Sequence, residues 1–136
     1  MRDRIAALRG ETAHRALVGR LSGIYCARGG NDMIAVEDFN NTIEFDFLTI
    51  QGSGGYSCFT GRLRAVKSGS AYTAREGGCS FRIVPQAGEL VFSSGNEPGC
   101  RDLCGARAAF GKHVFPFADR RPLPSSWTSA MESGGC

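Results

Sequence analysis

Histidine is almost absent from this chain: His14 and His113 are the only two among 136 residues. General acid–base catalysis usually relies on histidine, or on paired carboxylates in a cleft. A Cys104–His113 nucleophile and base is the one pair that invites a catalytic interpretation, and half a disulfide explains Cys104 better. The sequence therefore predicts a protein that is not an enzyme and has no catalytic residues.

Paired metal ligands are also missing. A structural zinc site typically takes two cysteines separated by two to four residues and a second such pair. Cys100 and Cys104 form one close pair, but no second pair accompanies them. We expect no metal and no cofactor.

The chain has no long hydrophobic run. Residues 1–20 alternate arginines and acids with alanine and leucine, so they contain neither a signal-peptide core nor a membrane span. An even number of cysteines in a short chain nevertheless indicates disulfides and an oxidising compartment. We expect a periplasmic or secreted protein whose leader is absent from this sequence, with six disulfide candidates whose pairing stays open: Cys26, Cys58, Cys79, Cys100, Cys104 and Cys136.

Strong charge of one sign is lacking too. The formal net charge is +3, and acids are interspersed with the arginines along the chain. Such a balance produces no field that would steer a polyanion. Nucleic acid is therefore not the expected partner.

What the sequence does contain is apolar residues at every second position. In residues 42–50, Ile43 and Phe45 alternate with acids, and at Phe47 and Leu48 the apolar phase slips, as a bulge or a bent barrel strand would require. Phe59, Phe81 and Phe92 fall on the inward parity of later short strands.

Short strands joined by glycine turns, without helices between them, are typical of an antiparallel barrel or sandwich. We predict an all-β fold: a small, disulfide-stapled antiparallel β-barrel of seven or eight strands with a short N-terminal helix. Its parts would be an N-terminal helical segment or linker (1–20), the barrel (21–117) and a flexible C-terminal tail (118–136).

Four arginines occupy outward positions on neighbouring predicted strands and could form a basic stripe for a polyanion. They are Arg62, Arg64, Arg75 and Arg82. Solvated arginines facing acids such as Glu44 explain them better, because the phenylalanines that could stack on bases point inward. The stripe stays an alternative.

The segments Cys79–Ile83, Gly88–Phe92 and Cys100–Arg107 together resemble the carboxy-terminal β domain of many proteobacterial envelope proteins. In some of these proteins that domain follows a helical lysozyme-inhibitor domain of the LprI type. The resemblance covers roughly residues 23–117 and implies an envelope protein.

Residues 68–72 are also similar to a serine–glycine–x–x–tyrosine loop in the membrane-bound and periplasmic inhibitors of C-type lysozyme, which are small eight-stranded barrels. Their second loop would fall at residues 92–97, where Ser94 stands in place of the family's lysine. The similarity implies that two loops enter the enzyme's cleft. The contact residues it implies are Ser68, Gly69, Tyr72, Ser94 and Asn96.

The leading hypothesis from the sequence is a periplasmic or secreted bacterial binding module for a protein partner, with C-type lysozyme as the specific candidate. A net-positive module gains no long-range attraction to a cationic lysozyme. The alternatives are a structural or accessory envelope domain without an enzyme target, and a polyanion-binding barrel.

Overall fold

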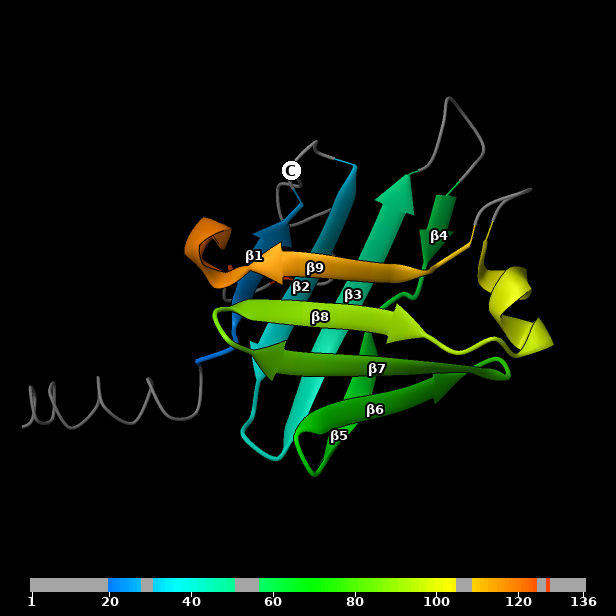
Figure 1. Ribbon diagram of the computed structural model, residues 1–136, viewed down its shortest axis with the longest axis horizontal. Coiled ribbons are helices and arrows are strands. Elements are labelled where there is room, and N and C mark those ends of the chain that lie inside the picture. The colour runs from blue at the N-terminus through cyan, green and yellow to red at the C-terminus, as the bar shows by residue number, and fades with distance from the viewer. Residues whose placement is uncertain (1–19, 28–30, 51–56, 105–108, 125–126, 128–136) are drawn as a thin grey trace, which may run out of the picture.

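The computed structural model describes residues 20–27, 31–50, 57–104, 109–124 and 127. Strands dominate this part of the chain, with two short 3₁₀ helices, η1 and η2 (Figure 1). The elements in order are β1 (Gly23–Cys26), β2 (Asp32–Asp38), β3 (Thr42–Ile50), β4 (Ser57–Phe59), β5 (Leu63–Ser68), β6 (Ala71–Glu76), β7 (Cys79–Gln86), β8 (Glu89–Ser94), η1 (Pro98–Leu103), β9 (Lys112–Pro116) and η2 (Phe117–Asp119).

All strands belong to one antiparallel sheet in the order β1-β2-β3-β5-β6-β7-β8-β9, with short β4 paired to the far end of β3. The sheet curls until its two edges approach each other (Figure 1). There Ile24 of β1 exchanges two backbone hydrogen bonds of 2.8 Å with Arg121, which follows β9 and η2. The expected antiparallel barrel is therefore confirmed as a nearly closed barrel of eight strands.

Alternation along the strands explains how the barrel is filled. Phe45 and Phe47 of β3 point inward and are fully buried, as the period-two pattern predicts. Phe47 stacks on Phe92 of β8 with ring centroids 3.9 Å apart, and Phe81 and Phe110 pack edge to face at 5.1 Å. These aromatic contacts place the core inside the barrel.

The phase slip in β3 is not a bulge. The pairing of β2 with β3 runs unbroken from Asp32 opposite Thr49 to Asp38 opposite Ile43. Leu48 instead points outward and is buried in a second apolar cluster on the outer face of β1–β3. The slip arises because this part of the sheet is covered on both faces.

The cover comes from residues within the predicted C-terminal tail (118–136), whose flexibility stays a prediction. Trp127 is buried against the outer cluster, and its indole N–H donates to Glu37 at 2.8 Å. The Arg62 guanidinium lies 3.9 Å from the centre of the Trp127 ring. Burial of so large an aromatic side chain holds Trp127 against the barrel.

Two further predictions concern Phe59 and the N-terminal helix. Its parity in the sequence predicts an inward Phe59, but the side chain is exposed, and its neighbour Cys58 points into the core instead. The reason is that β4 has only three residues and is positioned by Cys58. The predicted N-terminal helix falls almost entirely in residues 1–19, outside the described residues.

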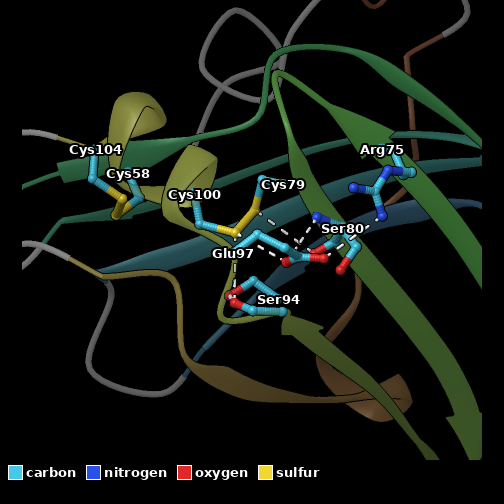
Figure 2. The surroundings of a disulfide bond; sticks show 9 residues. Cys58, Arg75, Cys79, Ser80, Ser94, Glu97, Cys100 and Cys104 are labelled. Atoms are coloured by element: carbon cyan, nitrogen blue, oxygen red, sulfur yellow. Dashed lines mark hydrogen bonds and ion pairs between the residues drawn. A yellow bond between two sulfur atoms is a disulfide. The ribbon is translucent and has the colours of Figure 1, made fainter.

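The structure assigns two disulfides, Cys58–Cys104 and Cys79–Cys100, both beside η1 (Figure 2). Cys26 is also disulfide-bonded, and no described cysteine is a free thiol. Cys136 lies outside the described residues. These bonds fit an oxidising compartment, and none of the described helices is long and apolar enough to cross a membrane.

Candidate functional site

The barrel has two ends with different loops. At one end, here called the turn end, lie the turn at 39–41 and the short turns between β5 and β6 and between β7 and β8. At the other, the disulfide end, lie the turn between β6 and β7, helix η1 and both disulfides (Figures 1 and 2).

The five predicted contact residues do not lie together. Ser68 and Gly69 are exposed at the turn end, whereas Ser94 and Asn96 lie at the disulfide end. Strand β6 spans the distance between these ends with six residues, which is roughly 20 Å at roughly 3.3 Å per residue. A rigid barrel can insert only one of the two loops into a single cleft.

Tyr72 is buried in the core and is not a surface contact. Its hydroxyl donates a hydrogen bond to the main-chain carbonyl of Asn40 at 3.0 Å. Burial raises the pKa of the Tyr72 phenol above its ordinary value of 10.0, so the hydroxyl remains a donor even at alkaline pH near that value. Tyr72 therefore positions the neighbouring turn.

We call residues 39–41 and 66–70 the loop pair. A second hydrogen bond joins these two turns besides the one from Tyr72. The Lys67 amide donates to the carbonyl of Asn41 at 2.9 Å. The first turn is fixed locally, because Asn40 adopts a left-handed φ of 81° that asparagine tolerates, and its amide donates to the Asp38 carboxylate at 2.7 Å. Backbone and side-chain contacts thus hold both turns in one arrangement.

The outer surface of the loop pair is partly apolar. Phe39 is 46% exposed and Val66 is 55% exposed. Both flank Thr42, because Phe39 donates its amide to the Thr42 carbonyl and Val66 lies opposite Thr42 in the sheet. Lys67, Ser68 and Asn41 add exposed polar groups around them.

Sequence reasoning missed Phe39 and Val66. The sequence does contain a signal for Phe39. An aromatic residue directly before two asparagines is in a turn, and turns lie at the surface. No comparable signal marked Val66, whose exposure follows from its outward parity in β5.

At the disulfide end, Glu97, Ser80 and Ser94 make polar contacts within the chain (Figure 2). The Glu97 carboxylate accepts the Ser80 amide at 3.4 Å and pairs with Arg75 at 3.6 Å. A hydrogen bond from the Ser80 hydroxyl is the main reason that the pKa of Glu97 is lowered. Ser94 donates its hydroxyl to the Gly95 carbonyl at 3.2 Å.

Cys79, Glu97 and Cys100 place possible metal-ligand atoms within 4.8 Å of one another. The two sulfurs are bonded to each other in this structure, which leaves the Glu97 carboxylate as the one available donor of the three. The oxidised cluster therefore does not make a metal site.

His113 is not paired with a nucleophile. Its Nδ1 lies 3.1 Å from the Asp32 carboxylate, and its Nε2 faces the Phe110 carbonyl. Cys104 is bonded to Cys58, which confirms the disulfide interpretation of Cys104. Both ring nitrogens of His113 therefore make polar contacts within the barrel, one to Asp32 of β2 and one to Phe110 before β9.

The predicted arginine stripe is mostly neutralised. Arg62 and Arg64 share the Glu44 carboxylate at 2.7 and 3.2 Å, and Arg75 pairs with Glu97. Hydrogen bonding from Arg62 is the main cause of a lowered pKa at Glu44. These pairs reduce the attraction that a polyanion would feel.

No family model matches this chain, and searches of curated proteins and of solved structures also found no match. The comparisons thus add no homologue to the two similarities read from residues 23–117 and 68–72.

Proposed function

We propose that this chain is a periplasmic or secreted module that binds a protein partner through the loop pair. The observation that carries the proposal is the joining of two turns from different hairpins by the Tyr72–Asn40 and Lys67–Asn41 hydrogen bonds. Exposed Phe39 and Val66 lie on the surface that these contacts fix.

Such an arrangement favours binding because the loops are ordered before a partner arrives. Ordering a loop or a side chain at an interface costs free energy, and preorganisation lowers that cost. The buried Asp38 carboxylate contributes by holding the amides of Leu21 and Asn40 at 3.1 and 2.7 Å. Folding alone therefore places the surface of the loop pair in its binding arrangement.

The chemistry of the loop pair suits a protein surface. An aromatic and an aliphatic side chain beside asparagine, lysine and serine reproduce the apolar centre and polar rim of protein interfaces. The barrel interior described here is occupied by packed phenylalanines, which favours recognition on the outside.

C-type lysozyme is the first partner to test, because the similarity of residues 68–72 implies it. With the two implied loops at opposite ends, inhibition would come from the turn end alone. Lys67 lies there, so attraction to a cationic enzyme would rest on short-range contacts and not on charge.

The test is binding and inhibition of C-type lysozyme by the whole chain, compared with Phe39→Ser, Val66→Ser and the control Asn96→Ala at the opposite end. We expect the two loop-pair variants to weaken binding by about tenfold or more, and the control to leave it unchanged. Weakening by Asn96→Ala alone would assign binding to the disulfide end.

If lysozyme does not bind, the same variants identify another partner by quantitative pull-down from a bacterial envelope extract. A protein retained by the wild type and Asn96→Ala but lost with Phe39→Ser and Val66→Ser would support the proposal. Equal recovery by all four chains, or no recovery, would favour a structural envelope domain.

A further inference from the structure

The outer face of β7, β8 and β9 carries a row of three valines. Val84 lies opposite Val91, and Val91 lies opposite Val114. Val91 in the middle is only 7% exposed, although it points away from the core, while Val114 at the edge is 42% exposed. The three side chains therefore form a continuous apolar strip.

A second row runs beside the first, two residues away on each strand. Arg82 lies opposite Ser93, and Ser93 lies opposite Lys112. Two residues along a strand correspond to roughly 7 Å, so a hydroxyl between two cations borders the valine strip. We call these six residues the valine–cation face.

Arg82 and Lys112 differ from the other three arginines of the predicted stripe. Arg62, Arg64 and Arg75 are all in ion pairs, whereas within the described chain neither Arg82 nor Lys112 makes one. Of the acids on β8 and just after it, Glu97 pairs with Arg75, and Glu89 keeps its charge while accepting a hydrogen bond from the neutral Gln86 amide at 3.5 Å. The six residues of the face therefore carry two positive charges, and neither cation has an ion-pair partner among the described residues.

On the opposite side of the barrel, residues of this chain cover a comparable outward-facing apolar surface. The outer face of β1–β3 is closed by Leu123 and Trp127 from the C-terminal segment. In Figure 1, β7, β8 and β9 form the layer in front of β1–β3. Val114 remains exposed on that front layer.

We propose that the valine–cation face binds an acidic amphipathic segment of a protein partner. Its aliphatic side chains would lie on the valines, and its carboxylates would pair with Arg82 and Lys112 and accept the Ser93 hydroxyl. Charge-assisted hydrogen bonds from arginine and lysine are among the strongest polar contacts that proteins make. The separation of roughly 7 Å between rows matches apolar and acidic side chains on adjoining faces of one segment.

A protein segment fits better than a membrane or a nucleic acid. Anionic membranes are recognised by clusters of about four to eight basic residues or by helices with large apolar side chains. Single-stranded nucleic acid is held by stacking on exposed aromatic rings, and neither row contains an aromatic residue. Two cations beside three valines match a small acidic and aliphatic target.

The probe is a fluorescent amphipathic peptide with leucines on one face and glutamates on the other. Its binding is measured by anisotropy with the whole chain. The comparison peptide carries lysines in place of the glutamates. The variants are Arg82→Glu with Lys112→Glu, and Val114→Asp; Arg101→Ser, an exposed cation of η1, is the charge control.

The wild type and Arg101→Ser should bind the glutamate peptide, and the lysine peptide should not bind. The charge-reversal pair and Val114→Asp should each weaken binding by about tenfold or more. Equal binding of both peptides, no effect of the variants, or no binding would overturn the proposal. So would tighter binding to phosphatidylserine vesicles or single-stranded DNA than to the peptide. The loop-pair variants are not involved, so this surface and the proposed function fail or succeed separately.

Discussion

The Tyr72 hydroxyl donates a 3.0 Å hydrogen bond to the carbonyl of Asn40, 32 residues away in the sequence. Tyr72→Phe removes this bond and should cost about 1 kcal/mol of unfolding free energy, measured by urea denaturation. Partner binding should weaken as well, because the first turn loses an anchor.

Tyr25→Phe is the matched control for that prediction. Tyr25 is also buried, and its hydroxyl donates to the Leu21 carbonyl at 2.7 Å. The Tyr25 hydroxyl also accepts a hydrogen bond from Arg120 at 3.4 Å, so its loss should lower stability by at least as much as Tyr72→Phe and leave binding intact. Equal binding by both variants would show that Tyr72 only stabilises the barrel.

The two disulfides should contribute unequally to stability. In the loop-entropy model, roughly 4 kcal/mol is expected for Cys58–Cys104, with a sequence separation of 46, and roughly 3 kcal/mol for Cys79–Cys100, with a separation of 21. Double alanine variants compared by chemical denaturation measure both. A larger loss on removing the shorter link would show that η1 packing, and not chain entropy, dominates.

Gly99 is required by close packing of η1 on the turn between β6 and β7. A Cβ at this position would collide with the carbonyl oxygen of Gly77 and lie 2.9 Å from Gly78 Cα. Because these are backbone atoms, Gly99→Ala should destabilise the protein by about 1–3 kcal/mol in thermal or urea unfolding.

Gly95→Ala provides the comparison for Gly99→Ala. Its Cβ would meet the side chains of Glu97 and Ser80, which can move. The cost should therefore be smaller. A reversed order of the two variants would contradict the packing argument.

Glu44 should make stability depend on acid pH. Its folded-state pKa lies below the ordinary 4.5, chiefly through the hydrogen bond from Arg62. The contribution of Glu44 to the free energy of unfolding is therefore complete above about pH 4.5. It is lost as the pH falls through the lower folded-state pKa. Glu44→Gln should reduce the loss of stability between pH 7 and about pH 3, measured by urea denaturation at both pH values. An unchanged loss in Glu44→Gln would contradict this assignment.

Much of the barrel could be predicted from alternation, because β5 to β9 bury chiefly one face and because Phe45, Phe81 and Phe92 follow the inward parity of their strands. The slip at Leu48 could not be interpreted correctly. Its burial depends on Trp127, which is distant in sequence and whose position no local pattern reveals.

The candidate site was only partly predictable for a related reason. Ser68 and Gly69 are in an exposed turn as expected, but which turn lies beside them depends on strand order. Pairing of β3 with β5 brings residues 39–41 next to them, and the direction of β8 carries Ser94 to the other end. Sequence spacing alone does not contain that information.

The junction between Ile24 and Arg121 has a kinetic consequence. Most strand pairs join neighbours in the chain, so they can form early from local contacts, whereas this pair unites the first strand with residues beyond the last. Contacts of such high contact order form late, after most of the chain is in place. The seam should thus be the final part of the sheet to acquire protection from amide hydrogen exchange during refolding.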